Sequence, residues 1–433
     1  MAVVLGVCAS LAPGLLPRTP SAQAMVTALL VLVGLGLTGI GRFVLRRTRF
    51  GGGDRLARWR WPVAGVGGFG VVCTMVQAGH WQNRLRDAMG VGSIGAAYWV
   101  HWALVSALIV GIVVGICRGV RWAGRRLGKL RSAALVAALG VGAQFVMVPT
   151  VVEWRRAAYA SADAFLDPAL VQPVSPTRSG SPGSMAGWTS LGAQGRRFVA
   201  GTPEHTVRVY VGLHSAPDLD ARVALAVREL ERTGGFERKN LVVTVPTGSG
   251  WIDSDAAKGL DKRFGGDVSL VGLQYSDAPS WVTFMFGRAA AEESARALFT
   301  AVEQRISTMA NPPKLYVYGQ SLGALGGSAI FADDADEDRR TCATLWAGPP
   351  AGDVHHAGAT VLANSSDPVV HWSPELLWRP ADLTGTRPDA PVPQWLPVLS
   401  FLQTSADLLA ALNAPAGHGH RYGMDQGTAL GSC

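Results

Sequence analysis

The sequence predicts an α-helical transmembrane region over residues 1–150, followed by an α/β domain with a mostly parallel, doubly wound sheet over residues 205–433. Nearly continuous runs of Val, Leu, Ala and Gly fill the first region. In the second, short apolar segments alternate with amphipathic ones, which is the pattern of parallel strands covered by helices on both faces. Residues 151–204 are expected to form a connector helix and an extended linker, because residues 172–203 are dense in Pro, Ser and Gly.

Four apolar runs are of membrane-helix type, and they cover Ala24–Val44, Pro62–Gln77, Ala96–Ile116 and Ser132–Val148. A fifth run, Ala2–Leu16, is short and contains Pro13, so a full span and a re-entrant or truncated helix are both compatible with it. More apolar runs follow, which argues against a cleaved signal peptide. The sequence therefore predicts four to five spans.

The net charge of +8 is unevenly distributed and does not indicate nucleic-acid binding. Residues 1–149 contain 16 Lys and Arg against two acidic residues, giving +14, whereas residues 150–433 contain 23 against 29, giving −6. The basic residues gather in two loops, at residues 42–60 and 118–131, and by the positive-inside rule both loops are cytoplasmic. The protein is therefore predicted to be a multi-pass protein of the cell membrane with an extracytoplasmic α/β domain.

Three of the five cysteines, Cys8, Cys73 and Cys117, lie in or beside the apolar runs, where a thiol behaves as a small hydrophobic group. Cys342 and Cys433 remain, and an oxidising compartment would permit a disulfide between them, although the sequence does not decide whether it forms. No group of Cys and His has the spacing of a zinc site, so no metal or other cofactor is predicted.

Six strands and four main helices are expected in the α/β domain. The strands cover Val207–Leu213, Leu241–Val245, Val268–Gln274, Leu315–Tyr318, Ala343–Trp346 and Thr360–Ala363, and the helices cover Ala221–Thr233, Asp255–Lys262, Ala289–Met309 and Phe401–Leu412. Ligands of open α/β sheets bind at the carboxyl ends of the strands, so candidate site residues are expected there.

The fourth strand runs directly into Gly-Gln-Ser-Leu-Gly at residues 319–323. A G-x-S-x-G pattern between a strand and a helix is typical of the nucleophile elbow of an α/β-hydrolase, in which the glycines leave room for a strained turn that exposes the serine. Ser321 is therefore the predicted nucleophile.

An acid and a base follow Ser321 in the order Ser, Asp, His that this fold uses. Asp367 comes just after the sixth strand, which favours it over Asp353 and Asp382, although a plain turn residue before a proline would look the same. His420 is the predicted base. His418 is the alternative, because it lies two residues earlier in the same Gly-rich loop.

The loop after the second strand reads Pro-Thr-Gly-Ser-Gly-Trp at residues 246–251. The backbone amides of Gly248 and Ser249, together with that of Leu322 after the nucleophile, are expected to form an oxyanion hole, while a turn that only connects two elements is the alternative. No G-x-x-x-x-G-K-[ST] pattern follows, so the loop is not a P-loop. The aromatic segment Ser280–Phe286 follows the third strand and is expected to be core, an acyl-chain wall or a membrane-touching lip.

Several further strings are informative together, among them Ser10–Arg18 (SLAPGLLPR), Val207–Leu213, Pro246–Trp251, Gly319–Gly323, Ser366–Val370 and Gly417–His420. They resemble an actinobacterial α/β-hydrolase family of membrane proteins with a multi-span N-terminal region. The resemblance covers nearly the whole chain and implies the hydrolase fold, but it implies no defined substrate. Gln320 departs from the family pattern, in which a Glu is expected before the serine.

The residues and the resemblance together predict a membrane-anchored serine hydrolase, of esterase or lipase type, acting on acyl esters of lipids or of the cell envelope. If a lipid or sugar hydroxyl replaced water, the same acyl-enzyme would make the protein an acyltransferase, and no residue separates these outcomes. A non-catalytic membrane scaffold is the third hypothesis, against which the complete Ser, Asp and His set argues. The expected partners are the lipid or acyl-ester substrate and the membrane, with no nucleic acid.

Overall fold

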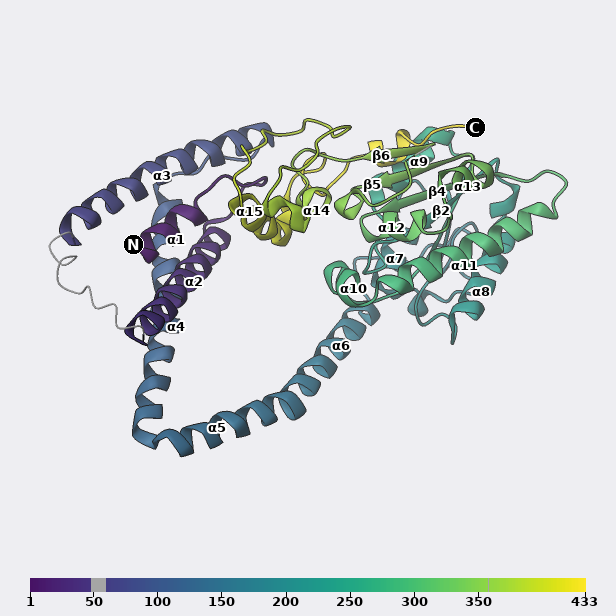
Figure 1. The fold of residues 1–433 in the computed structure, drawn as a ribbon. Helices are drawn as coiled ribbons and strands as arrows, with labels where there is room; N and C mark the ends of the chain where they lie inside the picture. Colours follow the sequence, from purple (N-terminus) through teal and green to yellow (C-terminus); the bar gives the residue numbers. More distant parts are fainter. Residues whose placement is uncertain (48–59, 357) are drawn as a thin grey trace.

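The computed structural model describes residues 1–47, 60–356 and 358–433. Most of the predicted basic loop at residues 42–60 lies outside these ranges. The N-terminal helices are α1 (Ala2–Ser10), α2 (Pro20–Arg47), α3 (Arg60–Ala88), α4 (Ala96–Leu127), α5 (Lys129–Gly142) and α6 (Val148–Ala164), with the π-helical turn η2 (Ala143–Met147) between the last two. Figure 1 shows α1 to α4 on one side of the molecule and the sheet on the other, with α5 and α6 as a long curved connection.

Within the described residues, three helices are long and apolar enough to cross a membrane: Pro20–Val44, Ala96–Leu127 and Leu130–Ala164. Each contains one of the predicted apolar runs. The nine residues of α1 make a helix about 14 Å long, which is too short for a hydrocarbon core of about 30 Å. The first run is thus the truncated helix rather than a full span, and the total of four to five spans stays a prediction.

The short helix α1 packs tightly on α2. A Cβ atom at Gly6 would lie 2.8 Å from the backbone of Val31, so the two helices cross at a distance that only glycine permits. A small apolar cluster, with Leu11, Ala24 and Trp102 among its members, joins the first four helices. Most other apolar side chains of these helices are exposed in the protein itself, which is the expected arrangement for helices whose surroundings are lipid.

The second part is a six-stranded parallel sheet in the order β1-β3-β2-β4-β5-β6. Its strands are β1 (Val207–Val211), β2 (Asn240–Val245), β3 (Val268–Leu273), β4 (Lys314–Gln320), β5 (Ala343–Ala347) and β6 (Ala359–Leu362). All six predicted strands are confirmed. They could be located because strands buried on both faces are nearly continuous in apolar residues.

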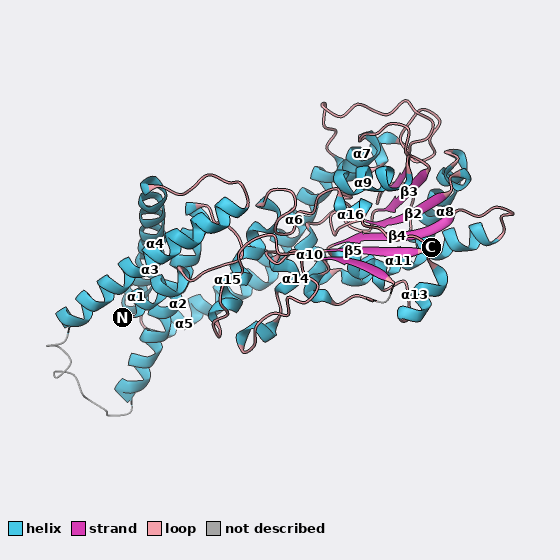
Figure 2. Ribbon diagram, turned by 90° about the horizontal axis from the view of Figure 1, so that it is seen from above, coloured by secondary structure: helices cyan, strands magenta, loops and turns pink. Residues whose placement is uncertain are grey.

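Helices cover both faces of the sheet (Figures 1 and 2). On one face lie α8 (Leu219–Arg232), α11 (Arg288–Ser307) and α12 (Leu322–Ser328), which pack against one another and against β1 to β4, and on the other lie α9 (Ser254–Phe264) and α16 (Asp425–Thr428). The remaining helices are α7 (Gly192–Ala200), α10 (Ser280–Phe286), α13 (Asp334–Arg340), α14 (Pro368–His371) and α15 (Leu399–Asp407). The predicted helix Phe401–Leu412 is α15 followed by the 3-10 helix η7 (Leu408–Asn413).

Segment 172–203 was predicted to be an extended linker, but much of it is packed against the sheet. Leu191, Phe198 and Val199 belong to the core cluster of the sheet, and α7 lies against β1. Arg178 is buried beside β1, and its backbone forms an isolated parallel β-bridge with the backbone of Arg208. The Pro, Ser and Gly residues of this segment make turns between packed pieces, and composition alone does not distinguish such turns from a linker.

The two parts are joined covalently through α6, whose end is fixed to the sheet. The buried Asp163 side chain accepts hydrogen bonds from the Ala193 amide and from Gln274 Nε2, each at 3.1 Å. At the other end of the chain, a disulfide joins Cys342 to Cys433 and ties the C-terminus to the start of β5.

Candidate active site

The strand β4 and the helix α12 meet at Ser321, which alone forms the turn between them. Its φ of 55° and ψ of −124° are a strained combination for a residue with a side chain, as in a nucleophile elbow. A Cβ atom at Gly319 would lie 2.3 Å from the Gly323 oxygen, and one at Gly323 would lie 2.3 Å from the Val245 oxygen. Both glycines of the pentapeptide are therefore required by the close approach of backbone.

Asp367 and His420 form a buried pair at the same end of the sheet, with 0% and 4% of their surfaces exposed. Asp367 Oδ2 lies 2.8 Å from His420 Nδ1 and accepts a hydrogen bond of 2.7 Å from the Tyr422 hydroxyl, while Oδ1 accepts from the Val369 amide at 2.8 Å. Burial by itself raises the pKa of Asp367, but the adjacent His420 and the other two donors together bring this pKa below its ordinary value. The carboxylate is thus held ionised against the imidazole.

The pair lies close to the nucleophile. The Ser321 amide donates to the Ala347 oxygen at 2.9 Å, and the next residue, Gly348, lies against the imidazole, since a Cβ atom there would be 2.8 Å from His420 Cε1. His420 Nε2 is buried and has no partner within the part of the chain that the structure describes. With Nδ1 engaged by Asp367, Nε2 is the nitrogen left to exchange a proton.

His418 belongs to a different pair. Its Nδ1 lies 3.2 Å from Asp389 Oδ2, which also accepts a hydrogen bond of 2.5 Å from the Ser366 hydroxyl. The structure thus brings His420, and not His418, to Asp367. The other two acids that the sequence offered, Asp353 and Asp382, lie on the surface.

The loop after β2 lies against the nucleophile elbow. A Cβ atom at Gly323 would be 2.7 Å from the Pro246 oxygen, and the Tyr275 hydroxyl donates to that oxygen at 2.8 Å. The amide of Leu322 is the first of α12, so it has no acceptor within the helix. Gly248 and Ser249, whose amides the sequence predicted to complete an oxyanion hole, lie two and three residues further along this loop.

The short helix α10 covers this loop, and the sequence did not predict it as a helix. Thr283 Oγ1 donates to the Gly248 oxygen at 3.2 Å, and a Cβ atom at Gly248 would lie 2.6 Å from Ser280 Cα. Three large apolar side chains of α10 point away from the protein, with Trp281 67%, Met285 63% and Phe286 82% exposed.

Comparison with known families identifies the chain. The alpha/beta-hydrolase family model matches residues 207–361 and 352–430, and the model of the same family's N-terminus matches residues 11–203. The chain belongs to the alpha/beta-hydrolase family. No curated protein and no solved structure matches the chain. An actinobacterial source stays a prediction.

Sequence reasoning missed three side chains that hold the histidine loop of this α/β-hydrolase family member. Tyr422 binds Asp367, Asp389 binds His418, and Asn364 Nδ2 donates to the Gly419 oxygen at 2.8 Å. The position of Tyr422, two residues after His420, was a usable signal, whereas nothing in the sequence marks Asp389. Gln320, the departure from the family pattern, is buried, and neither atom of its amide has a partner in the described residues.

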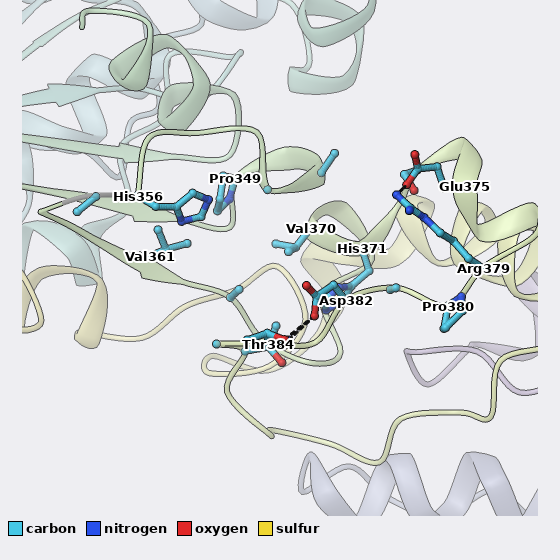
Figure 3. A pocket seen from close by; sticks show the side chains of 18 residues that line it. Pro349, His356, Val361, Val370, His371, Glu375, Arg379, Pro380, Asp382 and Thr384 are labelled. Carbon is cyan, nitrogen blue, oxygen red and sulfur yellow. Dashed lines mark hydrogen bonds and ion pairs between the residues drawn. The ribbon is translucent and has the colours of Figure 1, made fainter. Parts of the chain in front are cut away.

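A cavity of about 820 Å³ lies beside the candidate site of the hydrolase, between the edge strand β6 and the loop at residues 379–386. Figure 3 shows Val370 and His371 of α14 among its lining residues, together with Glu375, Arg379 and Asp382. Ser321 and His420 do not line it. The helix α14 therefore connects the candidate site to the cavity. Its N-cap residue Asp367 contacts His420, and its last two residues, Val370 and His371, line the cavity.

Proposed function

We propose that the protein is a membrane-anchored serine hydrolase that cleaves acyl esters of lipids or of cell-envelope components, with Ser321, His420 and Asp367 as its catalytic residues. The observation that carries this proposal is the buried 2.8 Å contact between Asp367 and His420 beside a serine with strained backbone angles. Family membership supports a hydrolase-type enzyme. The roles of the three residues and the class of substrate are what we propose.

In the first half of the reaction, Ser321 Oγ attacks the ester carbonyl while His420 Nε2 takes the serine proton. Asp367 keeps Nδ1 protonated and stabilises the imidazolium. The proton then passes from Nε2 to the leaving alcohol, and an acyl-serine remains. Water, deprotonated by the same nitrogen, attacks the acyl carbon, and the fatty or other carboxylic acid leaves as the serine regains its proton.

The negative charge that develops on the carbonyl oxygen requires amide donors. In our proposal the Leu322 amide donates on one side of the oxyanion hole, and the amides of Gly248 and Ser249 donate on the other. A single lost donor of this kind typically costs a factor of about 100 to 1,000 in turnover.

An extracytoplasmic position is supported by two independent features. The positive-inside rule assigns the basic loops at residues 42–60 and 118–131 to the cytoplasm, so a span after residue 131 would carry the α/β region to the other side. The disulfide between Cys342 and Cys433 lies in the α/β region, and such bonds persist in oxidising compartments.

The position of α10 supports a lipid substrate. Residues 132–152 are 21 uncharged residues, about 32 Å of helix, followed by Glu153, Trp154 and two arginines that mark an interface. From Trp154 to Asp163, where α6 joins the sheet, the helix rises only about 14 Å. Figure 1 shows α10 beside this end of α6. Because α6 rises so little above the interface, we propose that the exposed Trp281, Met285 and Phe286 of α10 reach the lipid surface.

The proposal is tested by labelling with a fluorophosphonate, which reacts with an activated serine. Wild type and Ser321→Ala are compared in membranes, with Ser307→Ala as the matched control because Ser307 is an exposed serine at the end of α11. We expect labelling of wild type and the control and none of Ser321→Ala. An impermeant fluorophosphonate should label intact cells as fully as lysed ones.

A folded wild type that stays unlabelled would contradict the serine hydrolase and favour the non-catalytic scaffold. Labelling only after lysis would contradict the extracytoplasmic position while leaving the hydrolase proposal intact.

A further inference from the structure

The first loop of the membrane region reaches across the molecule to the end of the hydrolase region. Arg18, in the loop between α1 and α2, forms an ion pair of 2.8 Å with Asp407 at the end of α15, and the two side chains are 3% and 0% exposed. A second donor, Arg18 Nε, lies 2.9 Å from the same carboxylate, and the Leu15 amide donates to its other oxygen at 2.7 Å. Figure 1 shows α15 beside the N-terminal helices.

A glutamine on the same helix completes the contact. Gln403 Oε1 and the Gln403 backbone oxygen accept from Arg18 at 2.6 Å and 3.0 Å, and Gln403 Nε2 donates to the Ala9 oxygen at 2.7 Å. Space is tight here, because a Cβ atom at Gly14 would lie 2.6 Å from Asp407 Oδ2. The contact is therefore a built, dehydrated interface and not a surface encounter.

Helix α3 fixes the loop from the membrane side. Gln82 accepts from the Arg18 amide at 2.8 Å, Arg86 donates to the Arg18 oxygen at 2.8 Å, and Trp81 donates to the Gly14 oxygen at 2.9 Å. The loop is thus held by α3 on one side while it holds α15 on the other.

The chain then leads from this contact to the predicted base. The helix η7 follows Asp407 directly, and its Ala411 oxygen accepts from the His420 amide at 3.2 Å. Leu16 touches the same loop, since a Cβ atom at Gly419 would lie 3.1 Å from Leu16 Cδ2, and Leu16 shares a small apolar cluster with Ala414. The backbone on which His420 sits is therefore in contact with the N-terminal loop on one side.

We infer that the loop Leu11–Arg18 is a positioning element for His420, so that the membrane region completes the active site in addition to anchoring it. This inference rests on the proposed function. Arg18 is a positioning residue, because it reaches the reacting atoms only through Asp407, η7 and the histidine loop. A displacement of a catalytic group by about 1 Å can cost a factor of about 100 in rate, so the loss of this support has a measurable effect.

The test uses the full chain in lipid nanodiscs with a soluble short-chain p-nitrophenyl ester. Active-site titration with a fluorophosphonate normalises each preparation to the number of reactive serines. For Arg18→Met we expect kcat to fall by about 30-fold or more while KM stays within about twofold. Arg18→Lys, which keeps the charge, should recover part of the lost kcat, a rescue that a general loss of folded protein would not give.

Two further variants keep the inference falsifiable. Arg340→Ala is the control, because Arg340 makes an equally close ion pair with Glu303 far from the histidine loop, and it should lower thermal stability without changing kcat. Leu16→Ala removes only an apolar contact and serves if Arg18→Met does not fold, with an expected fall in kcat of about fivefold.

Wild-type kcat in both Arg18→Met and Leu16→Ala would overturn the inference and leave the serine hydrolase standing. Equal kcat losses in Arg18→Met and Arg340→Ala would also overturn it. A wild type without turnover or labelling would instead count against the proposed function itself.

Discussion

The two parts of the chain handle apolar residues in opposite ways. In the hydrolase region the strands β1 and β3 are fully buried, and Asp367 is paired with His420 within the protein. In the membrane region the most apolar window of Leu130–Ala164 has no buried residue at all. The comparison teaches that the hydrolase region buries its apolar residues against itself, whereas the N-terminal helices leave most of theirs exposed. The loop Leu11–Arg18 is the exception, because it packs against α15 of the other half.

The sharpest test of the proposed triad in the hydrolase region compares its two neighbouring histidines. His420→Asn should lower kcat by about 1,000-fold or more, because it removes the proton acceptor beside Ser321. His418→Asn should cost less than about tenfold, because His418 pairs with Asp389 and not with Asp367. Steady-state hydrolysis of a soluble ester measures both variants, and the reverse order would make His418 the base.

The redox chemistry of the two regions should also differ. Cys342→Ser opens a bridge between residues 91 apart and should reduce the free energy of unfolding by about 4 kcal/mol, because the unfolded chain gains freedom. Cys73→Ser, a free and exposed cysteine of the membrane region, is the matched control and should change stability little. Thermal unfolding with and without a reductant measures this, and a wild type insensitive to reductant would contradict a structural role of the bridge.

A buried acid in the hydrolase region gives its stability a pH dependence. Glu337 is 1% exposed, its Oε1 accepts from Thr344, and Oε2 has no partner in the described residues. Burial raises the pKa of Glu337 from its ordinary value to about 7. The folded state therefore holds the Glu337 proton more tightly than the unfolded state does. The stability that the protonated side chain contributes is fully present below pH 4.5 and is lost as the pH rises through 7.

Replacement of this acid should remove that dependence. Glu337→Gln should be more stable than wild type at pH 8, by roughly 3 kcal/mol at most, and the two should converge near pH 5. Glu293→Gln, at an exposed position of α11, is the control and should follow wild type at every pH. Chemical unfolding between pH 5 and 8 measures the difference, and parallel curves for wild type and Glu337→Gln would contradict the buried charge.

Features that depend on residues close together in the sequence could be predicted, whereas contacts between distant residues could not. The strands and the elbow at Ser321 were predictable, because an apolar run and a five-residue pattern each carry their own structural reason. The pairs Asp389 with His418 and Arg18 with Asp407 were not, since the second joins residues 389 apart in the chain and no spacing encodes such a contact. Segment 172–203 was misjudged because composition reports turns but not what they pack against.

The helix α10 is where the two regions should meet through lipid, and it gives the smallest effect expected here. Trp281→Ser and Phe286→Ser remove exposed apolar area beside the loop of Gly248, so the double variant should hydrolyse a long-chain ester embedded in vesicles about tenfold more slowly. Hydrolysis of a soluble short-chain ester should be unchanged, because neither side chain contacts the triad. Leu130→Ser, at an exposed apolar position at the start of the candidate span Leu130–Ala164, controls for general effects of a lost lipid contact. Equal losses on both esters would mean that α10 shapes the site itself, as an acyl-chain wall. A loss confined to the vesicle ester would mean that α10 brings the hydrolase region to the lipid. Both regions of the chain would then contact the membrane.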